Sequence, residues 1–305
     1  MIERNYVLVI IPTYNRKSMI TDAINSVLTQ DYPYFRMVIV DDGSTDNTKK
    51  LCEEIVSKNP ERIIYQLKEN GGCSSARNKG LEFISDDVGY VCFLDSDDRL
   101  LPGKLSREVN LLRNNPSASF SYADSIVYDE VKNHESLYRV AAAGRPKDFA
   151  IEHFQSNEAK CSALLYKAEI FVNKRFREDL RYNEDSEFLQ RIAIEYNGVY
   201  CAIPGCWVRF HSGSKSRNFL EINKAVLKSS QGILDLYPEF YKCYKEQIDG
   251  TILRIRKTLF KQLILNKHWE EAKLYANNLG EKILVASRLK VYYQMRQALG
   301  RILRQ

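Results

Sequence analysis

The chain has 305 residues, of which 44% are hydrophobic, and a formal net charge of +6. These values predict a soluble globular protein of one or two domains, and no apolar stretch approaches the roughly 20 residues that a membrane span requires. The seven cysteines are odd in number and form no CxxC pair, which argues against a disulfide framework and a zinc site. The mild positive charge favours anionic partners such as nucleotide diphosphates or acidic lipid headgroups.

Short apolar strands alternate with helices over the first hundred residues. The predicted strands are Tyr6–Ile11, Phe35–Val40, Arg62–Leu67 and Tyr90–Leu94, and the predicted helices are Arg16–Gln30, Asp46–Ser57 and Ser74–Ile84. This order predicts parallel β-α-β units whose sheet is buried on both faces. The fold class is therefore α/β, with a mostly parallel sheet flanked by helices.

The pattern is looser after Pro102, which suits the first turn of a helix. Further strands are predicted at Ala118–Tyr122, Ser125–Asp129, Ser162–Tyr166, Val199–Ala202 and Cys206–Phe210, with a helix at Asn183–Tyr196 and an irregular segment at Val131–Lys147. The chain from about Ser216 onward has helical periodicity. Its predicted helices are Leu220–Leu236, Gln247–Leu265, Trp269–Leu279 and Lys282–Leu303.

Polar loops follow three of the early strands: Pro12–Arg16, Asp41–Asp46 and Asp95–Asp98. Ligands in parallel sheets bind beyond the carboxyl ends of the strands, so these loops mark a site. Two adjacent acids at the end of a buried strand, as at Asp41 and Asp42, need partners. A carboxylate there can accept a hydrogen bond from a nucleobase imide.

The Asp95–Asp97 triplet places carboxylates at i and i+2, where both can point to one side of an extended turn. Hard oxygen ligands suit Mg²⁺ or Mn²⁺, and such an ion would neutralise a departing diphosphate. A solvated turn or a helix cap is the alternative interpretation. Gly71 and Gly72 precede a predicted helix start, where free N–H groups attract anions, and Arg77 lies one turn further on.

Four of these segments together resemble the family 2 glycosyltransferases, which are inverting enzymes of the GT-A fold. The segments are IPTYNR at Ile11–Arg16, VDDGSTD at Val40–Asp46, GGCSSARN at Gly71–Asn78 and LDSDD at Leu94–Asp98. The resemblance implies a GT-A domain over residues 1–215, with a nucleotide-binding half at 1–105 and an acceptor-binding half at 106–215. A helical region would follow at 216–305.

The resemblance also implies a role for individual residues. Asp42 would bind the uracil edge with Asp41 nearby, Arg77 would contact the nucleotide or order the acidic loop, and Asp95 and Asp97 would form the DxD motif, with Asp97 the direct metal ligand. The full set expected to bind the nucleotide sugar is Pro12, Thr13, Tyr14, Arg16, Asp41, Asp42, Arg77, Asp95, Ser96 and Lys215.

A second acidic cluster begins the predicted helix at Asn183–Tyr196. A glycosyl acceptor hydroxyl needs a general base, and a helix N-terminus keeps a carboxylate ionised. Asp185 is the predicted base and Glu184 the second candidate; helix N-terminal charge alone is the alternative. His211 could complete the metal shell with Asp95 and Asp97, or be merely exposed, whereas no role is expected for His134, His153 or His268.

The predicted function is inverting transfer of a sugar from a UDP-sugar to a saccharide or lipid-linked saccharide, aided by Mn²⁺ or Mg²⁺, in bacterial surface polysaccharide synthesis. A sugar nucleotidyltransferase-like enzyme is a weaker candidate because Pro12–Arg16 contains no glycine. A non-catalytic nucleotide-binding protein is disfavoured because the expected acidic positions are all present. No nucleic-acid partner is expected, because basic residues cluster only near the C-terminus.

Two C-terminal stretches, Thr251–Lys267 and Val285–Gln305, contain several basic residues and no acid. Basic amphipathic helices suggest contact with an anionic membrane surface or a protein partner, and a helical bundle with solvated basic faces is the alternative. The apolar run Val7–Ile11 is too short for a secretory leader. The expected location is the cytoplasm, with peripheral contact at the inner face of the membrane.

Overall fold

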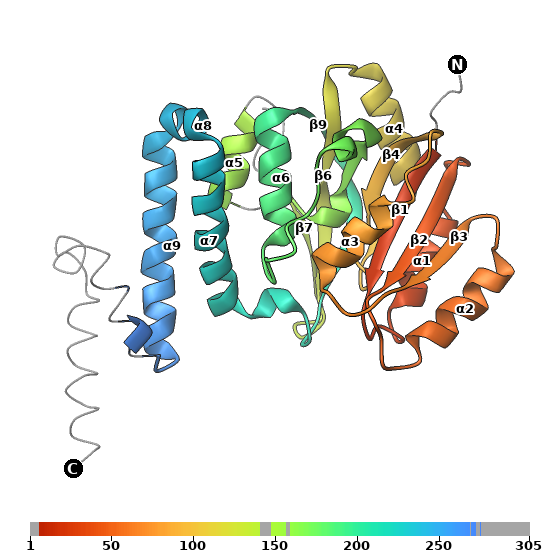
Figure 1. Ribbon diagram of the computed structural model, residues 1–305, viewed down its shortest axis with the longest axis horizontal. Helices are drawn as coiled ribbons and strands as arrows, with labels where there is room; N and C mark the ends of the chain where they lie inside the picture. Colours follow the sequence, from red (N-terminus) through yellow and green to blue (C-terminus); the bar gives the residue numbers. More distant parts are fainter. Residues whose placement is uncertain (1–5, 141–147, 157–158, 269, 273–274, 276–305) are drawn as a thin grey trace, which may run out of the picture. The chain divides into compact units, whose positions relative to one another are not determined.

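The structure, a computed structural model, describes residues 6–140, 148–156, 159–268, 270–272 and 275. It divides into two compact units, Met1–Arg217 and Asn218–Gln305 (Figure 1). Every residue predicted to bind donor, metal or acceptor lies in the first unit.

The first unit is built on a mixed sheet, nine-stranded within the described residues, with the order β3-β2-β1-β4-β8-β6-β9-β5 and β7 paired to β6. The strands are β1 (Tyr6–Thr13), β2 (Phe35–Asp41), β3 (Ile63–Leu67), β4 (Val88–Phe93), β5 (Arg99–Leu100), β6 (Ala118–Asp129), β7 (His134–Tyr138), β8 (Leu164–Lys167) and β9 (Asn197–Phe210).

The predicted parallel β-α-β units are confirmed in the first half of this sheet. β1 pairs in parallel with β2 and with β4, and β2 pairs in parallel with β3. The register sets Thr13 opposite Asp41, so the loops that follow β1 and β2 start side by side. The carboxyl ends of β1, β2 and β4 therefore lie at one edge of the sheet.

Alternate side chains of each strand point to opposite faces of the sheet, and both faces are apolar. Helices therefore cover both faces, and two separate cores form. Val7, Val9 and Ile11 pack with α1 (Ile20–Leu28) and α4 (Lys104–Asn114), whereas Leu8 and Ile10 pack with α3 (Cys73–Leu81) and α6 (Glu184–Glu195). Further helices are α2 (Thr48–Lys58) and α5 (Phe149–Ser156). α3 lies very close to the sheet, since a Cβ on Gly80 would be 2.4 Å from Ile10 Cγ2.

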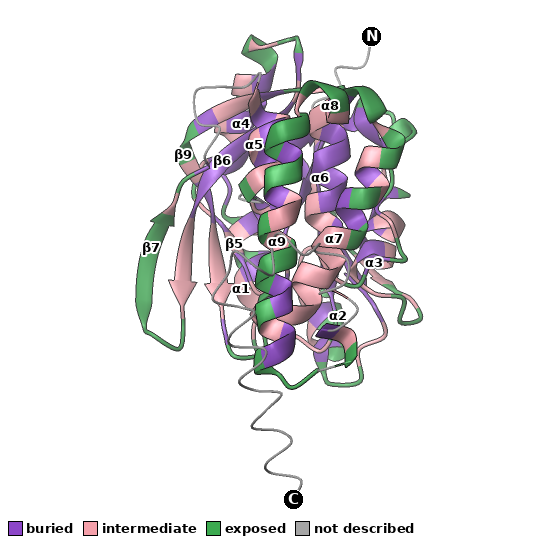
Figure 2. Ribbon diagram, turned by 90° about the vertical axis from the view of Figure 1, so that its left-hand side faces the viewer, coloured by how far each residue is buried: buried purple, intermediate pink, exposed green. Residues whose placement is uncertain are grey.

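The second half of the sheet departs from the sequence prediction in several places. β6 and β9 are single strands, so the prediction of two strands for each was wrong. The pairing between β6 and β9 shifts register in the middle. Ala123 of β6 lies opposite Cys201 of β9, but Ser125 lies opposite Cys206, so the ladder of backbone pairs is interrupted there. β7 lies within the segment predicted to be irregular, and it pairs as an exposed outer strand (Figure 2). β5 and α5 were not predicted.

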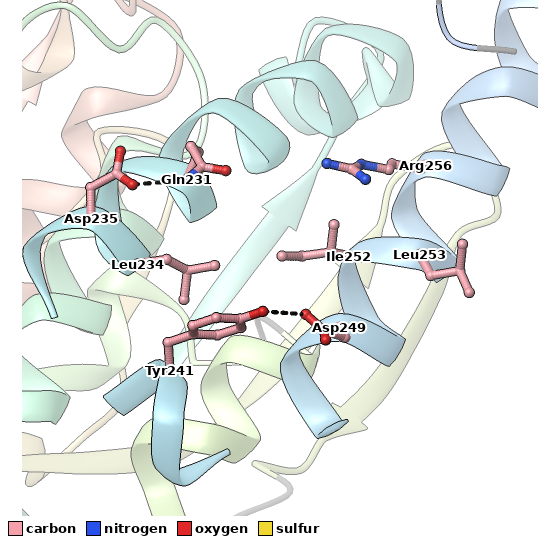
Figure 3. A pocket seen from close by; sticks show the side chains of 8 residues that line it. All are labelled: Gln231, Leu234, Asp235, Tyr241, Asp249, Ile252, Leu253 and Arg256. Carbon is pink, nitrogen blue, oxygen red and sulfur yellow. Dashed lines mark hydrogen bonds between the residues drawn. The ribbon is translucent and has the colours of Figure 1, made fainter. Parts of the chain in front are cut away.

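The second unit contains the helices α7 (Phe219–Leu236), α8 (Pro238–Cys243) and α9 (Lys245–Leu265). The helices predicted at Leu220–Leu236 and Gln247–Leu265 are confirmed, whereas most of Trp269–Leu279 and all of Lys282–Leu303 lie outside the described residues. A pocket of about 470 Å³ opens between α7, α8 and α9 (Figure 3). Among the described residues, every helix is too short or too polar to cross a bilayer.

A buried ion pair lies beneath the second half of the sheet, on α4. Lys104 Nζ donates to Glu108 Oε1 at 2.6 Å, and Ser121 Oγ donates to Glu108 Oε2 at 2.7 Å. Both charged side chains are almost completely buried. Removal of one partner leaves an unpaired charge in the core, which is far more costly than removal of both.

Glu108→Ala should therefore lower the free energy of unfolding by about 3–5 kcal/mol, as measured by urea denaturation. The double variant Lys104→Met/Glu108→Leu keeps the volume without the charges and should recover most of the loss. Equal stability of Glu108→Ala and the wild type would show that the pair is not desolvated as the structure indicates.

Candidate active site

Hydrogen bonds join the loops after β1 and β2 into one tip. Asn15 adopts a left-handed conformation with φ of 52°, and its backbone N–H donates to Ser44 Oγ at 2.9 Å. Its side-chain Oδ1 accepts from the backbone N–H of Thr45 at 2.8 Å. Pro12 and Thr13 are buried at this tip, whereas Tyr14 is 44% exposed and offers an accessible aromatic ring.

The two aspartates at the end of β2 have the partners that their burial requires, and the partners differ. Asp41 accepts from the backbone N–H of Ser44 at 2.8 Å and from the Tyr65 hydroxyl at 2.7 Å. Burial, together with the bond to Asp41, raises the pKa of Tyr65. Asp41 therefore holds the β2 turn against β3, an internal role.

Asp42 organises the glycine loop. Its carboxylate accepts from the backbone N–H groups of Gly71 and Gly72 at 2.9 and 2.7 Å, and from Lys68 Nζ at 2.7 Å. Gly43 makes the connecting turn with φ of +80°, where a Cβ would be 3.2 Å from the Asn70 backbone nitrogen. The Lys68 contact has no signal in the sequence, because it depends on β3 lying beside β2.

Arg77 connects the acidic loop after β4 with the start of α6. The guanidinium is 2% exposed and donates to Asp95 Oδ1 at 2.8 Å and to Glu184 Oε1 at 3.2 Å. Burial raises the pKa of Glu184 and the neighbouring Asp185 raises it further, while Arg77 opposes the rise. Arg77 was expected either to contact the nucleotide or to order the acidic loop. Its bond to Asp95 within this chain is a contact of the second kind.

Asp97 lies against a different pair of residues. Its Oδ2 is 3.1 Å from His211 Nε2 and 3.8 Å from Arg16 Nε. His211 Nδ1 accepts from the Gly213 backbone N–H at 3.2 Å, which turns the opposite ring nitrogen, Nε2, towards Asp97.

The donor set fits a hard divalent cation. In the described part of the chain, no three His, Cys, Asp or Glu side chains form a ready-made ligand set. Mg²⁺ commonly takes only one or two protein carboxylates and completes its shell with phosphate oxygens and water. Asp95 and Asp97, with side chains 36% and 19% exposed, can supply those carboxylates.

The other predicted residues surround this network. Ser96 is buried between the two acids, and Lys215 is exposed but close enough to act electrostatically on Cys73 and Glu184. Asp185 is partly exposed, and its Oδ1 accepts from the backbone N–H of Ser186 at 2.8 Å. The candidate base is thus adjacent in sequence to the carboxylate that Arg77 joins to Asp95.

His153, for which no role was predicted, supports this helix start from α5. Its ring is buried and stacks on Phe149, and Nε2 is 3.2 Å from the Ser186 carbonyl oxygen and 3.1 Å from Ser186 Oγ. Burial lowers the pKa of His153 to about 4, so the ring is neutral near pH 7. No local pattern distinguishes it from an exposed histidine, because its burial depends on α5 packing against α6.

Known proteins show the same fold and family. The structure is similar to that of S. aureus TarS 1-349 in complex with UDP-GlcNAc, with a TM-score of 0.58, 17% identity, and coverage of 89% of this chain and 88% of that one. The fold is GT-A, as the sequence predicted. The family model described as "Glycosyl transferase family 2" matches residues 8–215. The chain belongs to this family of glycosyltransferases.

Two curated relatives illustrate the family. A putative teichuronic acid biosynthesis glycosyltransferase of Bacillus subtilis, TuaG, is 42% identical over 38% of this chain and 45% of its own length. A GalNAc(5)-diNAcBac-PP-undecaprenol beta-1,3-glucosyltransferase of Campylobacter jejuni is 31% identical over 58% of this chain and 56% of its own length. The alignments span about half of each of these relatives.

The burial of His153 generates a pH-dependent term in stability. Its pKa is about 4 in the folded protein against an ordinary value of 6.5, so between these values the unfolded chain binds a proton that the folded one does not. Stability is therefore lost as the pH falls from about 6.5 towards about 4. At pH 5 the wild type should have lost about 2 kcal/mol through this group.

His153→Phe should remove that term, so its free energy of unfolding should change less than that of the wild type between pH 7.5 and pH 5. Urea titrations at both values measure the difference, and His134→Phe, at an exposed position, should retain the wild-type dependence. A dependence in His153→Phe equal to that of the wild type would mean that this ring is accessible to protons in the fold.

Proposed function

We propose that the chain transfers a sugar from a UDP-sugar to a saccharide or lipid-linked saccharide acceptor, with inversion at the anomeric carbon. One observation carries the proposal. The buried Arg77 guanidinium bridges Asp95, at the tip of β4, and Glu184, at the start of α6. It thereby brings a carboxylate loop suited to a diphosphate-bound cation next to Asp185, a carboxylate suited to act as a base.

Three features support the proposed binding of the UDP-sugar donor: the tips of β1 and β2, and the start of α3. Tyr14 presents an exposed ring at the tip of β1, where a nucleobase could stack. Asp42 fixes the Gly71–Gly72 loop immediately before α3, so the free N–H groups of the first turn of α3 are available to a diphosphate. Lys215 adds a positive charge close to the same helix start.

The cation would be Mn²⁺ or Mg²⁺, held by Asp95 and Asp97 together with diphosphate oxygens. A bound divalent ion supplies charge stabilisation for the departing diphosphate. Arg77 orients Asp95 for this task, and Arg16 and His211 orient Asp97. His211, which the sequence suggested as a further metal ligand, contacts Asp97 through Nε2 and so lies where it could also approach the cation.

Asp185 would act on the acceptor. Its carboxylate takes the proton of an acceptor hydroxyl while that oxygen forms a bond to the anomeric carbon. The bond from the anomeric carbon to the diphosphate oxygen breaks in the same displacement, so the new linkage has the opposite configuration. The first turn of α6 favours the ionised carboxylate through its free N–H groups, one of which binds Asp185.

Family membership favours this reaction over the two alternatives, a nucleotidyltransferase-like enzyme and a non-catalytic nucleotide-binding protein. The names of the two relatives refer to teichuronic acid and to an undecaprenol-linked oligosaccharide. By analogy, a cell-surface polysaccharide or its lipid-linked precursor is the proposed acceptor class, and UDP-GlcNAc, the ligand of the TarS structure, is one UDP-sugar to test.

Metal-dependent release of UDP from a panel of UDP-sugars tests the proposal. The wild type should release UDP from at least one of them with Mn²⁺ or Mg²⁺, and faster when acceptor is present. Asp185→Asn should lower transfer about 10²–10⁴-fold, the usual contribution of a general base, while UDP affinity remains within about twofold.

Asp179→Asn is the matched control, because Asp179 is an exposed acid in the loop before α6. It should transfer sugar at the wild-type rate. Full transfer by Asp185→Asn would place the base elsewhere, and absence of UDP release from every donor in the panel would refute the proposed reaction.

We further propose that the second unit contacts an anionic membrane surface. The described part of this unit has exposed Arg254, Lys257 and Lys261 along α9, with no acid between Thr251 and Lys267. Figure 2 shows α9 with exposed segments along its length. Such a surface would suit an enzyme with a lipid-linked acceptor. The basic stretch Val285–Gln305, also expected to contribute, lies outside the described residues.

Lys257→Glu/Lys261→Glu in the full-length chain should reduce co-sedimentation with phosphatidylglycerol-containing vesicles by at least about tenfold, since each basic residue near the surface contributes about 1 kcal/mol. Vesicles of phosphatidylcholine alone should pellet neither protein. Lys50→Glu/Lys58→Glu, which makes the same charge change on exposed positions of α2, is the control. Equal pelleting of both double variants would rule out a specific contribution from α9.

A further inference from the structure

We infer that Ser162 is a positioning residue for the divalent cation, because its hydroxyl fixes the same acidic loop that Arg77 binds. The inference rests on the proposed function and extends it to a residue outside every motif in the sequence. Ser162 lies in the short 3-10 turn Cys161–Ala163, immediately before β8.

One hydroxyl makes two bonds to the loop. The backbone N–H of Asp95 donates to Ser162 Oγ at 3.2 Å, and Ser162 Oγ donates to Asp98 Oδ2 at 2.8 Å. The loop also closes on itself, since the Asp98 backbone N–H donates to the Asp95 carbonyl oxygen at 3.0 Å. Both ends of the Asp95–Asp98 turn are therefore attached to the same oxygen atom.

The sheet explains why Ser162 is at this place. β8 pairs antiparallel with β4, with Tyr90 opposite Lys167 and Val91 opposite Tyr166. Continuation of this register past the end of β4 sets Ser162 opposite Asp95. The contact is thus a consequence of strand pairing between the two halves of the unit, and no local sequence pattern could reveal it.

The bonds also decide which aspartates can face a cation. Asp98 is 5% exposed, and its other oxygen, Oδ1, accepts from the backbone N–H of Arg209 at 3.1 Å. Both of its oxygens are therefore bound by interior groups, whereas Asp95 and Asp97 are partly exposed. Ser162 thereby holds the turn in the form that presents only these two carboxylates.

Loss of the hydroxyl would leave the Asp95 N–H and one Asp98 oxygen without their partner in a buried position. Ser162 is 1% exposed, so water cannot readily replace it. The turn would then be free to relax, and the two outward carboxylates would lose their relative placement. The effect should fall on the metal-bound nucleotide complex rather than on nucleotide contacts made elsewhere.

The experiment is calorimetric titration of the full-length protein with UDP, in Mn²⁺ and in EDTA. Ser162→Ala should weaken UDP binding in Mn²⁺ about tenfold, the scale of one lost buried hydrogen bond, and change binding in EDTA less than twofold. Ser162→Thr keeps the hydroxyl and should restore most of the Mn²⁺-dependent affinity. In the transfer assay, Ser162→Ala should need more Mn²⁺ for half-maximal rate, with kcat at saturation within about twofold of the wild type.

Ser121→Ala is the matched control, since Ser121 is also a buried serine bonded to a carboxylate, in this case Glu108. It should share any general loss of stability and keep the wild-type response to Mn²⁺. Wild-type affinity of Ser162→Ala in Mn²⁺, or an equal loss in Mn²⁺ and EDTA, would overturn this inference alone. A wild-type protein whose UDP binding ignores Mn²⁺ would overturn the metal-dependent function and this inference with it.

Discussion

The candidate site depends on a single buried guanidinium. Arg77 is almost without solvent contact, and the carboxylates of Asp95 and Glu184 compensate its charge. The next residue, Asn78, holds the loop before α6 by exchanging two 2.9 Å hydrogen bonds with the Phe176 backbone, and the Phe176 ring lies 5.2 Å from the Arg77 guanidinium. One turn of α3 thus fixes both the acidic loop and the approach to α6.

This arrangement makes the two halves of the first unit interdependent. A buried charge is tolerated only where its partners are held in place, so the strand tip and the helix start cannot shift independently without exposing or unpairing Arg77. Glu184 illustrates the balance, because burial and Asp185 raise its pKa while Arg77 opposes the rise. The adjacent Asp185 remains partly exposed, as the proposed role of a base for the acceptor hydroxyl requires.

The early strands, helices and loop residues of the site could be predicted because their signals are local. Parallel strands that alternate with helices must end at one edge, so Thr13, Asp42 and Asp95 follow from the pattern alone. Ser162, Lys68 and His153 could not be predicted, because each gains its position from a tertiary pairing: β8 with β4, β3 with β2, and α5 with α6. β6 and β9 were each predicted as two strands for a related reason. The register shift between Ala123 and Ser125 breaks the apolar periodicity in the sequence, but neither strand ends there.

The acidic loop shows how position assigns different tasks to similar side chains. Asp95 faces Arg77, Asp97 faces His211 and Arg16, and Asp98 faces Ser162 and the Arg209 backbone. Burial, reinforced by the charges of Asp95 and Asp97, raises the pKa of Asp98 well above its ordinary value. A third outward carboxylate would add electrostatic repulsion at the surface of this loop. An inward Asp98 therefore braces the turn, and only Asp95 and Asp97 remain partly exposed at its surface.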